Sequence, residues 1–128
     1  MPPAPANPTT DVLLIEDDES VRSSLTKGLE QAGLRVMGVG NAAAALAALK
    51  QRTFRAIICD LILPDREGTS FYEQIKDQVP DMAERVLFLT GWGADQKVQK
   101  LLEYTGRPFL AKPVDLKILV DAVRKIAG

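Results

Sequence analysis

The chain has 128 residues, of which 46% are hydrophobic and 26% are charged, and its formal net charge is −1 at pH 7. These values predict one soluble globular domain, and the lack of a basic run argues against direct nucleic-acid contact. One cysteine and no histidine exclude a disulfide framework, histidine catalysis and histidine metal ligands. No apolar run reaches the ~18 residues of a membrane span, and there is no signal-peptide pattern, so we expect a cytoplasmic protein without direct membrane contact.

Four prolines stand within residues 1–10, which we expect to form an extended, disordered lead or the end of a linker. A single domain is expected over residues 11–128. The apolar run at 11–16 predicts the first strand, and helical spacing over 19–32 predicts the first helix, which Gly33 ends.

The rest of the chain repeats this strand–helix alternation. Four more apolar runs predict strands, at 34–39, 56–60, 85–90 and 108–111. Four more helical patterns follow them, at 42–50, 69–78, 94–104 and 115–127. Five such units predict an α/β fold, a doubly wound five-stranded parallel sheet with five helices on both faces. The strand order 2-1-3-4-5 suits five strands, but periodicity alone does not establish it.

Polar residues stand at the ends of four predicted strands. Glu16 and Asp17 follow the first, Asp60 ends the third, Thr90 ends the fourth and Lys112 follows the fifth. Because parallel strands bring their carboxyl ends to one edge of the sheet, we expect these side chains to gather there. Each residue alone is more often a cap, a turn former or a solvated side chain, so the combination is the signal.

This combination predicts phosphoryl transfer. Three carboxylates in one pocket repel one another unless some are protonated or a cation neutralises them, and oxygen ligands without cysteine or histidine favour Mg²⁺. Asp60 would be the nucleophile and Asp17 with Glu16 would hold the metal. The Thr90 hydroxyl and the Lys112 ammonium would bind phosphoryl oxygens.

Other polar and aromatic residues receive structural interpretations. We interpret Asp18, Glu19 and Asp65 as surface acids, although Asp17 or Asp18 can also cap the first helix. Trp92 is interpreted as a loop residue at the rim of the pocket.

Four motifs follow one another along the chain: Leu14-Ile15-Glu16-Asp17-Asp18 with Arg22, Cys59-Asp60-Leu61-Ile62-Leu63-Pro64-Asp65 with Gly68, Leu89-Thr90-Gly91, and Phe109-Leu110-Ala111-Lys112-Pro113. Over residues 11–127 they resemble the receiver domain of bacterial two-component response regulators. The resemblance implies a flavodoxin-like fold with strand order 2-1-3-4-5. It implies a phosphorelay protein in which Asp60 accepts a phosphoryl group from a phosphohistidine on a histidine kinase or histidine phosphotransfer partner.

The resemblance also implies roles for individual residues. Glu16, Asp17 and Asp60 would hold Mg²⁺, with Asp17 as a direct ligand, and Ile62 would add its backbone carbonyl. The protein would phosphorylate and dephosphorylate itself rather than turn over an external substrate. The face of the fourth helix, fifth strand and fifth helix would be the output surface, with a homodimer as one use of it.

The switch residues implied by the resemblance are Thr90 and Phe109, with Lys112 as the family's lysine and a cis Lys112-Pro113 bond. Phe109 stands where the family often has tyrosine, which leaves its ring without a hydroxyl. Ile62 and Trp92 are apolar at positions beside the pocket. We hypothesise that these two neighbours slow hydrolysis of the acyl phosphate.

Four alternatives remain open at this point. The chain is a stand-alone receiver or the receiver of a hybrid histidine kinase that regulates its own kinase or passes phosphate on. A flavin-binding carrier of the same fold would need a glycine- and hydroxyl-rich loop after the first strand. An aspartate phosphatase would need a second aspartate where Ile62 stands. A purely scaffolding receiver would not need the intact set of site residues.

Overall fold

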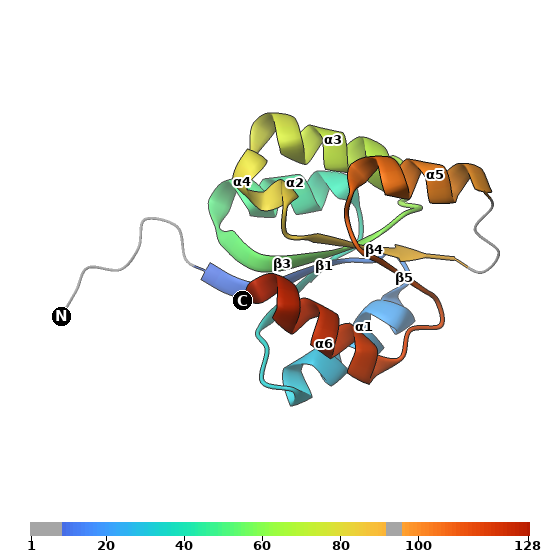
Figure 1. Cartoon of the computed structure of the whole chain (residues 1–128). Helices are drawn as coiled ribbons and strands as arrows, with labels where there is room; N and C mark the ends of the chain where they lie inside the picture. Colours follow the sequence, from blue (N-terminus) through green and yellow to red (C-terminus); the bar gives the residue numbers. More distant parts are fainter. Residues whose placement is uncertain (1–8, 92–95) are drawn as a thin grey trace.

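The computed structural model describes residues 9–91 and 96–128. Within them, five strands and six helices follow one another along the chain (Figure 1): β1 (Thr9–Ile15), α1 (Glu19–Gln31), β2 (Val36–Val39), α2 (Ala42–Gln51), β3 (Thr53–Asp60), α3 (Gly68–Gln78), α4 (Pro80–Ala83), β4 (Val86–Thr90), α5 (Gln96–Thr105), β5 (Phe109–Ala111) and α6 (Leu116–Ala127). The strands form one sheet in the order β2-β1-β3-β4-β5, and every neighbouring pair is parallel. The predicted fold class and strand order are confirmed.

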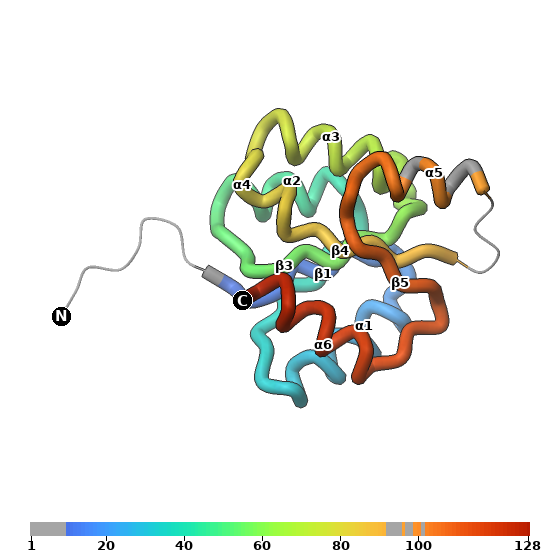
Figure 2. The backbone as a smooth tube through the Cα atoms, in the orientation of Figure 1, coloured from blue at the N-terminus to red at the C-terminus, as the bar shows by residue number. Residues whose placement is uncertain are grey.

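The helices form two layers, one on each face of the sheet. α2, α3, α4 and α5 cover one face, and α1 and α6 cover the other (Figures 1 and 2). This arrangement follows from right-handed crossovers between parallel strands on both sides of β1. β2 and β5 are the edge strands, and the carboxyl ends of all five strands lie at the same edge.

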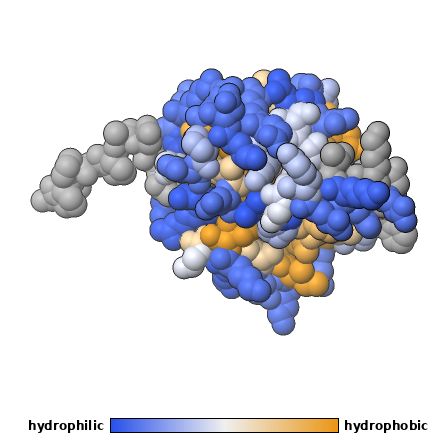
Figure 3. Space-filling view, turned by 45° about the horizontal axis from the view of Figure 1, so that its top comes forward, coloured by the Kyte–Doolittle hydropathy of each residue, from blue (hydrophilic) through white to orange (hydrophobic). Residues whose placement is uncertain are grey.

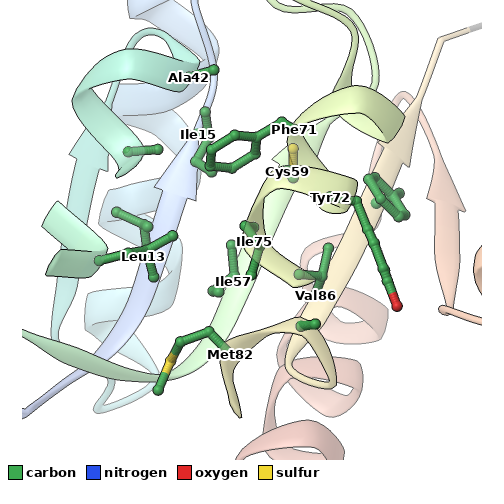
Figure 4. Close-up of a cluster of buried hydrophobic side chains, with 14 of the residues drawn as sticks. Leu13, Ile15, Ala42, Ile57, Cys59, Phe71, Tyr72, Ile75, Met82 and Val86 are labelled. Atoms are coloured by element: carbon green, nitrogen blue, oxygen red, sulfur yellow. The ribbon is translucent and has the colours of Figure 1, made fainter. Parts of the chain in front are cut away.

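Both faces of the sheet are buried, and the strand sequences reflect this. Along β1, Leu13 and Ile15 point into the core beneath α2–α5, while Val12 and Leu14 point into the core beneath α1 and α6. Figure 4 shows the first of these cores, where Leu13 and Ile15 lie on the same side of the sheet as Phe71 of α3. A strand that is covered on both faces reads as a continuous apolar run rather than an alternating one.

Apart from shifts of one or two residues at the ends of elements, the observed elements differ from the predicted ones in two places. Residues Pro80–Ala83 form a short additional helix, α4, which brings the number of described helices to six. Proline at the first helical position starts a helix as readily as it ends the preceding one. β3 begins at Thr53 rather than at residue 56. The prediction started too late because exposed Arg55 separates buried Phe54 from the rest of the apolar run. Neither difference changes the topology.

The ends of the described residues bear on two further expectations. β1 takes in Thr9 and Thr10, while the rest of the predicted lead, residues 1–8, lies outside the described part of the chain. Trp92 also lies outside it.

No helix among the described residues is both long and apolar enough to cross a bilayer. Seen partly from the side of α3 and α5, the surface is hydrophilic over most of the view (Figure 3).

Candidate functional site

The predicted site residues gather at the carboxyl edge of the sheet. Glu16 and Asp17 follow β1, Asp60 ends β3, Thr90 ends β4, and Lys112 follows β5. The backbone N–H of Lys112 donates to the carbonyl of Thr90 at 2.8 Å, which continues the β4–β5 ladder past its last pair. The sheet register therefore brings residues that are up to 96 positions apart in sequence to one site.

Lys112 joins the two buried carboxylates of this site. Its Nζ donates to Oε1 of Glu16 at 2.7 Å and to Oδ2 of Asp60 at 2.8 Å. Glu16 is 1% exposed and Asp60 is 6% exposed, so both carboxylates have little contact with water. Charge-assisted hydrogen bonds in such surroundings are strong, and they hold the three side chains in one arrangement.

The pKa values of Glu16 and Lys112 follow from the close approach of these three side chains. Burial raises the pKa of Glu16 to about 7, its interaction with Asp60 adds to the rise, and the hydrogen bond from Lys112 opposes it. Burial acts to lower the pKa of Lys112, but its hydrogen bonds to Asp60 and Glu16 outweigh burial and raise it. Lys112 therefore stays protonated at neutral pH, while Glu16 is close to its titration midpoint.

The backbone around Asp60 and Glu16 is also fixed. The N–H of Ile62 donates to Oδ1 of Asp60 at 3.2 Å, so both oxygens of this carboxylate have a donor. Arg22 of α1 donates from Nη1 to the carbonyl of Glu16 at 2.7 Å. Asp18 caps α1 by accepting from the N–H of Val21.

Cys59 lies directly beside the site but takes no part in its chemistry. It is fully buried, and burial, reinforced by the nearby charge of Asp60, raises the pKa of its thiol well above the usual range. The thiol stays protonated and donates to the carbonyl of Asp60. A buried, protonated thiol is not a nucleophile at neutral pH.

The acidic residues fit a hard divalent cation. Glu16, Asp17 and Asp60 each offer a carboxylate oxygen, and these oxygens lie within 4.8 Å of one another. Among the described residues, Oε2 of Glu16 is a buried polar atom without a hydrogen-bond partner. An all-oxygen donor set with an unsatisfied oxygen matches the ligands that Mg²⁺ prefers.

The remaining predicted site residues differ in exposure. Thr90 is 3% exposed, whereas Ile62 is 76% exposed and Phe109 is 42% exposed. Phe109 pairs with Phe88 in the β4–β5 ladder, and the Phe88 ring stacks on Tyr72 of α3 with 5.9 Å between ring centroids. The Lys112-Pro113 peptide bond is cis, as the resemblance implies.

Asp65 has contacts that the sequence analysis missed. Its two carboxylate oxygens accept from the backbone N–H groups of Ala42 and Ala43, at 2.9 and 3.0 Å, so it caps α2 from another loop. The interpretation as a surface acid was incomplete. Hydrophobic periodicity carries no signal for a polar contact between residues 23 positions apart.

Comparison with protein families gives a match over residues 12–124 to the response regulator receiver domain. The response regulator receiver protein CpdR of Brucella abortus is 30% identical over 115 residues, which cover 90% of this chain and 94% of CpdR. Three further curated relatives are much longer, and the matches cover only 24%, 23% and 26% of their lengths.

Solved structures share the fold. A CheY-like response regulator receiver domain protein from Methanospirillum hungatei superposes with a TM-score of 0.81 at 24% identity, and 94% of each chain is covered. The signal receiver domain of a signal transduction histidine kinase from Syntrophus aciditrophicus has a TM-score of 0.82 at 25% identity, and 92% of this chain and 89% of that chain are covered.

Proposed function

This chain belongs to the family of response regulator receiver domains, and from that premise we propose that Asp60 is its phosphoacceptor. The phosphoryl group would come from a phosphohistidine on a histidine kinase or a histidine phosphotransfer protein. The observation that carries the proposal is the buried carboxylate of Asp60, 2.8 Å from the Lys112 ammonium and within 4.8 Å of the oxygens of two further acids. We also propose residues 9–128 as the receiver unit, since β1 begins at Thr9 rather than at the predicted residue 11, and residues 1–8 as its lead or linker.

In the proposed reaction, one carboxylate oxygen of Asp60 forms a bond to phosphorus. The bond between phosphorus and the imidazole nitrogen breaks, and the imidazole leaves with the electron pair. Lys112 and Thr90 would donate hydrogen bonds to the phosphoryl oxygens, on which negative charge is concentrated. Because Lys112 is held between Asp60 and Glu16 before reaction, little reorganisation is needed to place its charge.

Glu16, Asp17, Asp60 and the backbone carbonyl of Ile62 are the proposed Mg²⁺ ligands. When bound, Mg²⁺ supplies positive charge that offsets the phosphoryl oxygens and the carboxylates. Support comes from the free oxygen of Glu16 and from the absence of nitrogen or sulfur donors in the cluster. This assignment also accounts for a site in which two buried acids share one lysine and a third acid lies close by.

The output surface is proposed to be the face formed by α5, β5 and α6. Large apolar side chains are exposed on all three elements: Tyr104 is 82% exposed, Phe109 is 42% exposed and Ile118 is 54% exposed. Inward movement of Thr90 on phosphorylation would make room for Phe109 and change this face, either for a partner or for a second copy of the chain. Light scattering with and without beryllofluoride would distinguish a dimer from a monomer.

The test of the phosphoacceptor uses acetyl phosphate with Mg²⁺ and intact-mass measurement. Wild type is expected to gain the mass of one phosphoryl group, and EDTA is expected to prevent the gain. Asp60→Asn is expected to gain nothing, while the matched control Asp81→Asn, in α4 (Pro80–Ala83), behaves as wild type. Phosphorylation of the Asp60→Asn variant would overturn the assignment.

A second candidate role is the receiver of a hybrid histidine kinase. The similarity to the receiver domain of the Syntrophus histidine kinase favours including it. Such a receiver regulates its own kinase or passes its phosphoryl group on to a histidine phosphotransfer domain. Rapid transfer from phosphorylated Asp60 to such a domain would support this role over that of a stand-alone response regulator.

A further inference from the structure

The loop over residues 61–67 joins β3 to α3 and lies beside Asp60. It is closed at its base, where the N–H of Gly68 donates to the carbonyl of Leu61 at 2.7 Å. A bridge between Ile62 and Glu67 narrows it further, and Leu63 is buried in the core beneath α2–α5. The loop is therefore a compact unit whose base is well anchored.

The exposed tip of this loop is attached to α2 by Asp65. The carboxylate is bidentate, with one oxygen on the N–H of Ala42 and the other on the N–H of Ala43. These are two of the first N–H groups of a helix, which have no partner within it and favour negative charge. The hydrogen bonds from Ala42 and Ala43 also lower the pKa of Asp65, which keeps the carboxylate ionised at neutral pH.

α2 also has a cap of its own. Asn41 accepts through Oδ1 from the N–H of Ala44 at 2.8 Å, as a normal N-cap residue does. Asn41 and Asp65 thus share the start of one helix, but only Asp65 belongs to the loop that carries Ile62. Substituting each residue in turn therefore distinguishes an effect on the stability of α2 from an effect on the position of the loop.

We propose that Asp65 is a positioning residue for phosphoryl transfer, which holds the 61–67 loop on α2 so that the backbone of Ile62 stays aligned with Asp60. The Ile62 N–H donates to Oδ1 of Asp60, and the Ile62 carbonyl is a proposed metal ligand. Residues that orient the groups around a metal or a nucleophile change affinity or rate by roughly 10–100-fold when removed. The inference rests on the proposed function of Asp60 for its effect on rate, but not for its effect on the loop.

The experiment compares Asp65→Ala, Asp65→Asn and the control Asn41→Ala, all at a temperature where each variant is folded. The first readout is water exchange of the Ile62 amide by NMR, and the second is the rate of uptake from acetyl phosphate at saturating Mg²⁺. Asp65→Ala is expected to accelerate the exchange and to slow uptake by about 10-fold. Asp65→Asn, which keeps one acceptor oxygen, should lie between Asp65→Ala and wild type.

Asn41→Ala is expected to lower the midpoint of unfolding while leaving both readouts within about twofold of wild type. If Asp65→Ala instead matches Asn41→Ala in both readouts, Asp65 is only a helix cap and the inference is overturned. If wild type takes up no phosphoryl group, the proposed function of Asp60 is overturned, while the Ile62 exchange still decides whether Asp65 positions the loop.

Discussion

The two ends of β1 carry acids in very different surroundings. Near its start, Asp11 accepts from the N–H of Arg35 at 2.8 Å and lies 3.7 Å from the guanidinium of Arg55, whose side chain is 60% exposed. Just past its end, Glu16 is 1% exposed, shares one lysine with Asp60, and keeps one oxygen unpaired. One strand thus connects a partly exposed acid that lies beside two arginines to a buried pair of acids that share one lysine.

The two groups of charges therefore differ in what they contribute to the stability of the fold. Ion pairs with an exposed partner, such as that of Asp11 with Arg55, contribute roughly 0–1 kcal/mol. Buried carboxylates lose hydration that one shared ammonium does not fully replace. We therefore expect the carboxyl end of the sheet to lower the stability of the protein when no cation is bound.

Removal of Lys112 should have the largest effect. In Lys112→Ala the carboxylates of Glu16 and Asp60 keep no ammonium between them, and the free energy of unfolding in EDTA at neutral pH is expected to fall by about 3 kcal/mol. Urea unfolding measures this change. Lys117→Ala, an exposed lysine of α6, serves as the control and should change stability by less than about 0.5 kcal/mol. Equal losses in both variants would contradict the contrast between the two ends.

The pH dependence of the free energy of unfolding should report the raised pKa of Glu16 directly. Its pKa is raised from 4.5 to about 7 in the folded protein, so between these values the folded state holds a proton that the unfolded state has lost. The contribution of Glu16 to the free energy of unfolding is fully present below pH 4.5. About 2–3 kcal/mol of this free energy is lost as the pH rises to about 7.

Urea unfolding in EDTA over this pH range, for wild type and Glu16→Gln, tests this expectation. The stability difference between the two proteins should shift in favour of Glu16→Gln as pH rises. A difference that does not vary with pH would show that Glu16 titrates normally.

Asp60→Asn should stabilise the metal-free protein. The amide keeps an acceptor for Lys112 but removes the repulsion between Asp60 and Glu16, and we expect a gain of about 1–2 kcal/mol in the free energy of unfolding. Mg²⁺ should then stabilise wild type more than the variant, since ligand binding to the folded state adds to stability. A destabilised Asp60→Asn variant would mean that the wild-type carboxylate is well compensated without metal.

The smallest effect is expected at the other end of β1. Arg55→Ala removes an exposed ion pair with Asp11, and the free energy of unfolding should fall by no more than about 0.5 kcal/mol, less at high salt. Thermal unfolding at low and high salt is the measurement. A loss above about 2 kcal/mol, comparable to that of Lys112→Ala, would remove the distinction between the ends.

The sequence was most informative about what parallel strands bring together. Because Asp60, Thr90 and Lys112 each stand at the end of an apolar run, their convergence follows from the sheet alone. The contact of Asp65 with α2 was not predictable in this way, since loop geometry decides it. Helix α4 was missed because Pro80 signals both the end of one helix and the start of another.

Gly68 joins the first turn of α3 to the tip of β3 so closely that a Cβ there would lie 2.7 Å from the carbonyl oxygen of Asp60. The two elements consequently behave as one stiff piece, and a shift of the Asp60 backbone must carry the start of α3 with it. Half-exposed Phe109, by contrast, belongs to a three-residue edge strand, β5, which is separated from β3 by β4. We therefore expect a change at Asp60 to move the start of α3 together with β3, and to be absorbed more easily by the short edge strand β5.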